Sequence, residues 1–253
     1  AAEKSDSVLA GPRYYWDDHR IFRFPPASGY SLWFRGGDQA AARFPLDAEL
    51  LSFQTETLFQ RHWDATEPFI EPFLNGACLL IRKDSKFFPG SKIFDERFFI
   101  YFEDTDLCTR MVLQAEFPVC VPSANAIHYW DQAPSDRKAE MMASSEQIFL
   151  GKYYGIDIPQ WTTPDNNVFE ISDLGSLREP PVFLREKNRV EGPLFLDFGI
   201  NPYFRPFARA DFDGQSFEFP ADIFARLAKG LYFTRILSSG IRRNRSIYRW
   251  RKE

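Results

Sequence analysis

The positions of apolar residues predict three helices in the first two thirds of the chain. Apolar side chains recur near helical spacing over 46–63, with Asp47 as the expected N-cap. A second helix should follow the acidic run that begins at Glu103, because five later residues would share one helical face: Leu107, Cys108, Met111, Val112 and Ala115. A third helix is expected over 137–154, and Gly155 would end it.

Short apolar runs between glycines and prolines predict strands. In residues 1–45, glycines and prolines interrupt the apolar runs at short intervals, which is typical of strands and hairpins rather than long helices. The continuous apolar run Cys78–Ile81 has the length of a buried strand. Two further short strands, Val119–Val121 and Ala126–Ile127, are expected on either side of Pro122-Ser123.

Beyond Gly155 the pattern loosens into short apolar pieces separated by prolines. This predicts an appended, mainly extended segment that closes with a helix near Ala221–Leu237 and a basic tail. We therefore expect an α/β chain in two parts, residues 1–158 and an accessory segment, 159–253. The basic tail suggests contact with phosphate, acidic lipid or nucleic acid, although a solvated basic terminus is the commoner case.

Composition narrows the possible partners. The 253-residue chain carries 31 Lys and Arg against 35 Asp and Glu, a formal charge of −4, and 44% of its residues are hydrophobic. This balance excludes wholesale disorder and lacks the basic footprint of a nucleic-acid-binding protein, so a small-molecule or saccharide partner is favoured. The longest wholly apolar stretches fall far short of the ~20 residues of a membrane span. Three cysteines without a C-x-x-C pair, and an amino terminus without an apolar leader, predict a cytoplasmic protein with buried thiols.

The acidic run Glu103-Asp104-Thr105-Asp106 is the strongest candidate for chemistry. Carboxylates at the start of a helix lie near the positive end of its dipole and near unpaired backbone N–H groups, which keeps them ionised. An ionised carboxylate in a pocket can accept a proton from an attacking hydroxyl. Spacing alone favours a simpler alternative, in which Asp104 caps the helix and its neighbours are solvated acids.

Three histidine-containing places are weaker candidates. His128 closes a strand-like segment, where it could bind a metal or phosphate, although a lone histidine is more often structural. Asp17-Asp18-His19 contains metal-binding side chains, but its flanks indicate a hairpin turn. His62 lies within the first predicted helix, where packing is the expected role.

Several of these pieces occur in a familiar order. The runs Asn75–Arg82 and Phe94–Cys108, followed by Val121-Pro122 and His128, span roughly residues 70–155. Their order and spacing resemble the carboxy-terminal half of glycosyltransferase family 2, particularly its rhamnosyltransferase-like and galactofuranosyltransferase-like members. Ala10-Gly11-Pro12 is similar to the strand that precedes this half.

The resemblance implies a partial GT-A fold and inverting transfer of a sugar from a nucleotide diphosphate donor. The acceptor would be a saccharide or glycolipid in the synthesis of a surface polysaccharide or related glycan. Asp104 matches the general base of the family's acidic motif, and Glu103 and Asp106 would support it or contact the acceptor. His128 matches a histidine that completes the shell of a divalent metal, Mn²⁺ or Mg²⁺, in some members. The loop that lines the acceptor side is matched by Asn75, Gly76 and Ala77.

Family members begin with a nucleotide-binding half that carries a D-x-D motif, and this half is not found before Ala10-Gly11-Pro12. Asp17-Asp18 lies on the wrong side of that strand to be the motif. The chain is then a piece of a longer enzyme, receives the donor half from elsewhere, or has lost donor binding. The metal is expected only with a D-x-D-bearing half, and the basic tail allows peripheral membrane contact.

The competing hypothesis is a non-catalytic saccharide-binding or scaffolding module. In it, aromatic residues on the surface would stack on sugar rings. The tryptophans considered for this role are Trp16, Trp33, Trp63, Trp130 and Trp161.

Overall fold

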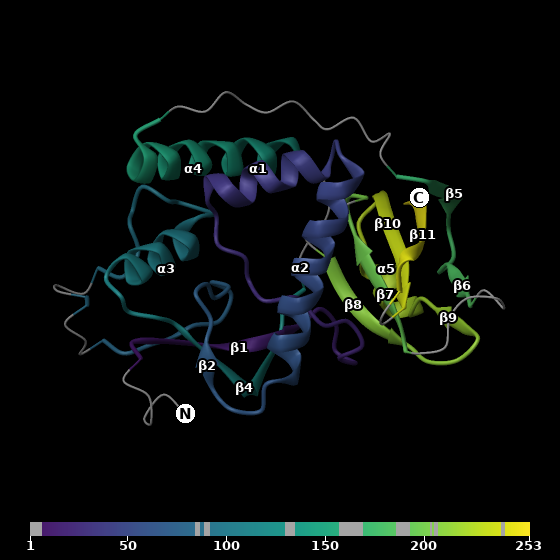
Figure 1. The fold of residues 1–253 in the computed structure, drawn as a ribbon, viewed down its shortest axis with the longest axis horizontal. Helices are drawn as coiled ribbons and strands as arrows, with labels where there is room; N and C mark the ends of the chain where they lie inside the picture. The colour runs from purple at the N-terminus through teal and green to yellow at the C-terminus, as the bar shows by residue number, and fades with distance from the viewer. Residues whose placement is uncertain are drawn as a thin grey trace.

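The computed structural model describes residues 7–83, 87–88, 92–129, 135–156, 169–185, 193–202, 204, 207–238 and 241–253. Its elements in chain order are β1 (Leu9–Tyr15), α1 (Leu32–Ala41), α2 (Pro45–Asp64), β2 (Phe69–Ile70), β3 (Leu80–Ile81), α3 (Glu103–Leu113), β4 (Val119–Ile127), α4 (Asp136–Tyr154), β5 (Ile171–Leu177), β6 (Val182–Leu184), β7 (Leu194–Gly199), β8 (Phe207–Phe212), β9 (Ser216–Glu218), α5 (Ala221–Arg226), β10 (Gly230–Ser238) and β11 (Ile241–Lys252). The α/β class is confirmed. The described strands form a four-stranded sheet, a five-stranded sheet and the two-stranded β6–β9 sheet, and α2 runs between the two larger ones (Figure 1). Among the described residues, no helix is both long and apolar enough to cross a bilayer.

The first sheet has the strand order β2-β4-β1-β3. β1 pairs in parallel with β4, and the short strands β2 and β3 pair antiparallel at the two edges. The run Cys78–Ile81 supplies only the two-residue strand β3. The two strands expected around Pro122-Ser123 are one strand, β4, whose pairing with β1 skips 122–124. These three residues form an irregularity of the kind that bends a strand without ending it.

Three helices, α2, α3 and α4, lie where the apolar periodicity predicts them. The ends of α4 are set by the Ser135 side chain, which accepts a hydrogen bond from the Lys138 N–H, and by Gly155, which adopts a left-handed conformation at φ 65°. The start of α2 differs from expectation. Its N-cap is Phe44 and Pro45 opens the helix, so Asp47 lies in the first turn and is not the cap.

Two parts of the sequence were predicted wrongly. The helix α1 forms over Leu32–Ala41 in spite of Gly36-Gly37, with Ser31 as its N-cap, and it packs against α2. The helix expected over Ala221–Leu237 is wrong: α5 stops at Arg226, and β10 begins at Gly230. β10 is paired on both sides, with β11 and β7, so tertiary pairing overrides the local helical pattern. The chain therefore closes with a strand, β11, which contains the basic tail.

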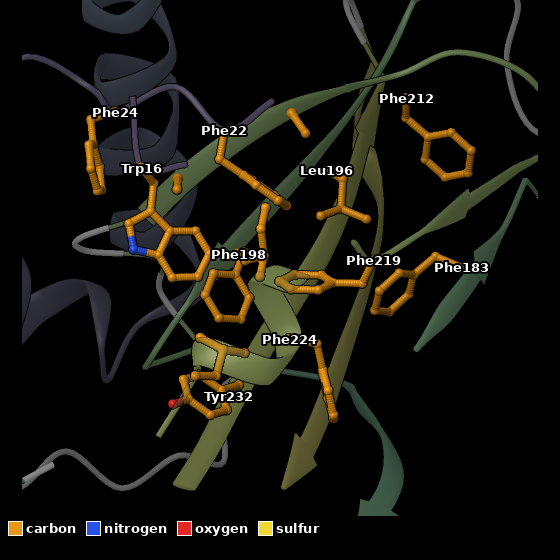
Figure 2. Close-up of a cluster of buried hydrophobic side chains, with 14 of the residues drawn as sticks. Trp16, Phe22, Phe24, Phe183, Leu196, Phe198, Phe212, Phe219, Phe224 and Tyr232 are labelled. Atoms are coloured by element: carbon orange, nitrogen blue, oxygen red, sulfur yellow. The ribbon is translucent and has the colours of Figure 1, made fainter. Parts of the chain in front are cut away.

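The second sheet has the order β5-β11-β10-β7-β8, and it is antiparallel except for the β5–β11 pair. Its core also includes residues from just after β1 (Figure 2). Trp16 stacks on Phe198 with ring centres 5.0 Å apart, and Phe22 lies 5.3 Å from Phe219. The region after β1 and the second sheet thus share one aromatic core. The expected division between residues 158 and 159 falls outside the described residues.

A buried carboxylate, Asp197 on β7, connects the second sheet to α2. Asp197 has no exposed surface and accepts hydrogen bonds from Arg209 Nε at 2.7 Å and from Arg235 Nε at 2.8 Å. Both arginines also reach α2, since Arg209 Nη1 lies 2.9 Å from Glu56 Oε1 and Arg235 Nη1 lies 3.3 Å from Ser52 Oγ. Burial alone raises the pKa of Asp197, but the two guanidinium groups outweigh it and hold that pKa below its usual range.

The substitution Asp197→Asn should strongly destabilise the fold, because it leaves two buried guanidinium groups without their charge partner. The free energy of unfolding, measured in urea by tryptophan fluorescence, should fall by about 3–5 kcal/mol. The exposed pair Asp173–Arg249, which joins β5 to β11, offers a matched control. Asp173→Asn should leave the unfolding midpoint nearly unchanged. Equal losses in the two variants would contradict the structural role of Asp197.

The same carboxylate predicts a pH dependence. Since the pKa of Asp197 is lower in the folded than in the unfolded chain, its stabilisation is complete above about pH 4 and is lost as the pH falls through the folded value. The difference in unfolding free energy between wild type and Asp197→Asn should therefore shrink on acidification from about pH 5 to about pH 2. A difference that is constant over this range would show that the charge of Asp197 is not responsible.

Candidate functional site

Asp104 is the second residue of α3, and its carboxylate is held by two backbone donors. The Gly76 N–H donates to Oδ2 over 2.8 Å, and the Thr105 N–H donates to Oδ1 over 2.7 Å. The N-cap of α3 is Phe102, so the simpler alternative, in which Asp104 caps the helix, is wrong. The acidic run does open the helix, as expected, and this places Asp104 near the positive end of the helix dipole.

The chain enters α3 through strained backbone. Tyr101 and Phe102 have φ values of 64° and 66°, in the left-handed region that disfavours bulky side chains. Such conformations persist where surrounding packing enforces them, and they cluster at functional sites. The left-handed backbone conformation of Phe102 is held by aromatic packing. Its ring centre lies 5.0 Å from that of Tyr30 and 5.5 Å from that of Phe149. The strained entry fixes where α3 presents Asp104.

Gly76 lies so close to Asp104 that a side chain there would crowd the carboxylate and require it to shift. A Cβ atom on Gly76 would lie 3.0 Å from the Asp104 Cβ and 3.2 Å from its Oδ2. Asn75 closes the same loop on itself, because its Oδ1 accepts a hydrogen bond from the Ala77 N–H over 2.8 Å. The loop 75–77 and the start of α3, distant in sequence, are therefore brought together.

Tyr14 on β1 anchors this loop through its hydroxyl group. Its single hydroxyl proton is shared between the Asn75 carbonyl at 3.1 Å and the Cys78 carbonyl at 2.9 Å, and its oxygen accepts from the Cys78 N–H at 3.0 Å. Burial is the main cause that raises the pKa of Tyr14 above its ordinary value, so the hydroxyl stays protonated. Sequence analysis missed Tyr14, because nothing in the run Tyr14-Tyr15-Trp16 distinguishes a loop anchor from a strand residue.

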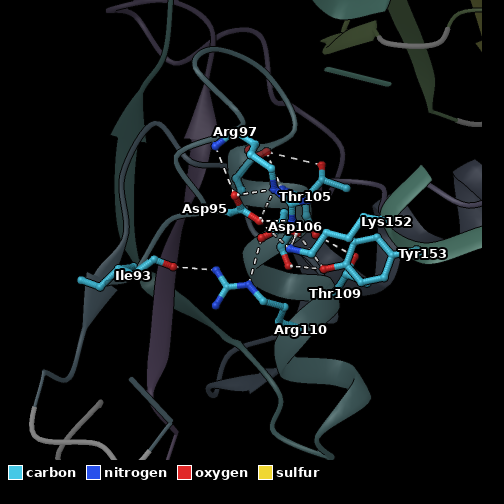
Figure 3. A network of polar contacts seen from close by, with 10 residues as sticks. Ile93, Asp95, Arg97, Thr105, Asp106, Thr109, Arg110, Lys152 and Tyr153 are labelled. Carbon is cyan, nitrogen blue, oxygen red and sulfur yellow. Dashed lines mark hydrogen bonds and ion pairs between the residues drawn. The ribbon is translucent and has the colours of Figure 1, made fainter. Parts of the chain in front are cut away.

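Asp106 is fully buried, and its carboxylate contacts protein side chains on two helices (Figure 3). It accepts from Arg110 Nε at 2.9 Å on its own helix, and from Tyr153 Oη at 2.7 Å and Lys152 Nζ on α4. Lys152 also lies 2.8 Å from Asp95 Oδ2. These contacts fix α3 against α4, and the role of Asp106 toward Asp104 or an acceptor stays a prediction.

Glu103 differs from its neighbours in having a partly desolvated carboxyl group. Burial is the main cause that raises the pKa of Glu103, and the nearby charge of Asp104 adds to it. Its Oε2 atom is buried without a hydrogen-bond partner among the described residues. Its burial thus favours the protonated form of Glu103.

His128 follows β4, and its backbone N–H donates to the Tyr15 carbonyl at 2.8 Å. Its ring makes an edge contact with Tyr14, with centres 5.9 Å apart, and burial lowers its pKa below the ordinary value. A neutral imidazole can ligate a metal. Within the described part of the chain, however, no group of three or more His, Cys, Asp or Glu side chains is arranged to hold one.

A cavity of about 410 Å³ lies between β1, α1, α2 and the second sheet. Asn75 and His128 both line it, whereas Asp104 does not. His62 and Glu71 also contribute to its wall, and their side chains form a buried pair with His62 Nδ1 3.1 Å from Glu71 Oε2. His62 therefore packs as expected. Nothing in the sequence indicates that His62 pairs with Glu71. Glu71 directly follows the short strand β2 and is brought to α2 only by the fold.

The other candidates have structural roles. Asp17 accepts hydrogen bonds from the Ile21 and Phe22 N–H groups, which confirms that 17–19 form a turn. His19 pairs with Asp222 on α5. In the basic tail, Arg249 pairs with Asp173, and membrane contact by this tail stays a prediction.

The tryptophans considered as a stacking surface are distributed unevenly. Trp16 is buried, and the Trp63 indole N–H donates to the Phe24 carbonyl at 2.8 Å. Trp33 on α1 is 80% exposed and is the one of these three with a free ring face. Trp130 and Trp161 lie outside the described residues.

Comparison with known proteins finds similarity over part of the chain. N-acetylglucosaminyl-diphospho-decaprenol L-rhamnosyltransferase, from two strains of Mycobacterium tuberculosis, is 37% identical to this chain over 89 residues. The match covers 33% of this chain and 28% of the rhamnosyltransferase. Part of the chain is thus glycosyltransferase-like. No protein-family model and no solved structure matches it.

The three thiols, which are all free, should differ in reactivity. Cys108 and Cys120 are buried and burial raises the pKa of each to about 11, whereas Cys78 is exposed. The prediction of buried thiols is therefore confirmed for two cysteines and wrong for Cys78.

A thiol with a pKa near 11 is only about one part in a thousand thiolate at pH 8. Ellman's reagent at pH 8 should therefore label one thiol rapidly in the folded chain, and Cys78→Ser should remove that phase. Rapid labelling of two or three thiols would contradict the packing of α3 against the first sheet.

Proposed function

We propose that this chain supplies the catalytic base and the acceptor side of an inverting glycosyltransferase with a GT-A-like fold. The observation that carries the proposal is the fixed position of Asp104, held at the start of α3 by the Gly76 amide of the loop 75–77. The partial similarity to a rhamnosyltransferase supports the same class of reaction. The donor would be a nucleotide-diphosphate sugar, and the acceptor a saccharide or a lipid-linked saccharide.

In this reaction the acceptor hydroxyl oxygen forms a bond to the anomeric carbon of the donor sugar. The bond from that carbon to the diphosphate breaks on the opposite face, and the hydroxyl proton passes to Asp104. Each Asp104 oxygen accepts one backbone hydrogen bond, which leaves further lone pairs to accept this proton. The tight contact between Gly76 and Asp104 would hold the acceptor-side loop at a fixed distance from the base.

A divalent metal, Mn²⁺ or Mg²⁺, would offset the charge that develops on a diphosphate leaving group. His128 is the residue of this chain that the resemblance assigns to the metal shell. The described residues do not form a metal site by themselves, so the remaining ligands would have to come from a D-x-D-bearing half. The proposal therefore rests on Asp104 and not on the metal.

The substitution Asp104→Asn tests the proposed base. Turnover of the full-length protein, measured as release of nucleoside diphosphate from dTDP-rhamnose or UDP-galactofuranose with membrane lipid extract as acceptor, should fall about 100- to 10,000-fold. The fold should be retained, because an asparagine amide oxygen can still accept one of the two backbone hydrogen bonds. Turnover equal to that of the wild type would refute the role of Asp104.

The neighbouring Asp106→Asn variant is the matched control. Because Asp106 bridges α3 and α4 through charged partners, its replacement should lower the unfolding midpoint more than Asp104→Asn does. A loss of turnover that follows loss of stability in both variants would indicate a structural effect. A loss in Asp104→Asn at unchanged stability would identify the base.

A further inference from the structure

The cavity between α2 and the second sheet is lined mainly by apolar and aromatic side chains. Its volume of about 410 Å³ lies in the range of small-molecule sites, which are mostly apolar with a few polar groups that fix orientation. Ser28 and Gln54 line the cavity and are exposed, so it is open to solvent on their side. The principal apolar contributors are Phe24, Phe34, Phe73, Leu51, Phe204 and Phe207.

The cavity adjoins the loop that holds the proposed base. Asn75 lines the cavity, and the next residue, Gly76, donates its N–H to Asp104. Tyr14, which anchors this loop, also lines the cavity, as does His128 beside it. A ligand in the cavity would therefore meet polar groups next to the loop 75–77 and apolar groups elsewhere.

Part of the apolar wall comes from the C-terminal region, which lies outside the residues that resemble glycosyltransferase family 2. Phe204 and Phe207 are 1% exposed, and Phe207 opens β8. Two residues further along β8, Arg209 joins the buried Asp197 to Glu56 on α2. This cluster holds β8 against the helix that supplies Leu51, so the C-terminal sheet and α2 form adjoining walls of one preformed apolar space.

We propose that this cavity binds an apolar group carried by the acceptor, such as an alkyl chain, while the acceptor's sugar lies toward the loop 75–77. The inference rests on the proposed function, and it assigns to the C-terminal sheet a part in acceptor selection. An amphipathic ligand fits because a free sugar would leave the aromatic walls in contact with water, whereas a hydrocarbon would leave Asn75 and His128 unused.

The probe for this proposal is octyl β-D-glucopyranoside, used well below the concentration at which it forms micelles, with methyl β-D-glucopyranoside as the control ligand. Isothermal titration of the chain should show saturable binding of the octyl glycoside, at least tenfold tighter than that of the methyl glycoside. The difference arises because the alkyl chain leaves water for the aromatic cavity. Equal affinity for the two glycosides would overturn the proposal.

Substitutions of two adjacent leucines on α2 test whether the octyl glycoside binds in this cavity. Leu51 lines the cavity, whereas Leu50 is 53% exposed and is not part of the lining. Leu51→Trp should fill the space and weaken octyl glycoside binding at least tenfold, and Leu50→Trp should leave it unchanged. Binding that is insensitive to Leu51→Trp would place the glycoside elsewhere and overturn the proposal.

The Asp104→Asn variant separates this proposal from the proposed function. It should bind the octyl glycoside as the wild type does, because Asp104 does not line the cavity. Tight binding together with normal turnover of Asp104→Asn would refute the catalytic role of Asp104 and leave the cavity proposal standing. Loss of turnover in Asp104→Asn without octyl binding by the wild type would refute the cavity proposal alone.

Discussion

A fully buried carboxylate must be neutralised, and in this protein that requirement ties the second sheet to one helix. Asp197 is paired with Arg209 and Arg235, which in turn contact Glu56 and Ser52 on α2. Because α2 and β8 both line the cavity, this cluster holds two of its walls together. An apolar contact could tolerate a shift of α2, whereas separating these charges inside the protein is costly.

The proposed base depends on a second, local arrangement. Tyr14 holds the loop 75–78 through three hydrogen bonds, and Gly76 lets that loop approach Asp104 closely. On the other side, Asp106 fixes α3 to α4. The carboxylate of Asp104 is thus positioned by contacts on both sides of α3. Positioning of this kind, before any substrate binds, is what general-base chemistry requires.

The sequence predicted the elements whose signal is local. The apolar periodicity located α2, α3 and α4, and the acidic run was correctly placed at a helix start. Features decided by distant contacts were missed. Residues 230–237 form a strand because β7 and β11 flank them, and α1 forms in spite of Gly36-Gly37 where it packs against α2. The cavity could not be predicted, because its wall combines β1, α2 and Phe204, which only the fold brings together.

We propose that the glycosyltransferase-like region and the C-terminal sheet build one acceptor site. A crystal structure of the chain with octyl β-D-glucopyranoside tests it most directly. The account predicts electron density for the alkyl chain between Leu51 and Phe207, with the sugar ring within hydrogen-bonding distance of Asn75. A glycoside bound away from this cavity, or inverted so that its sugar contacts Phe204 and Phe207, would contradict the account.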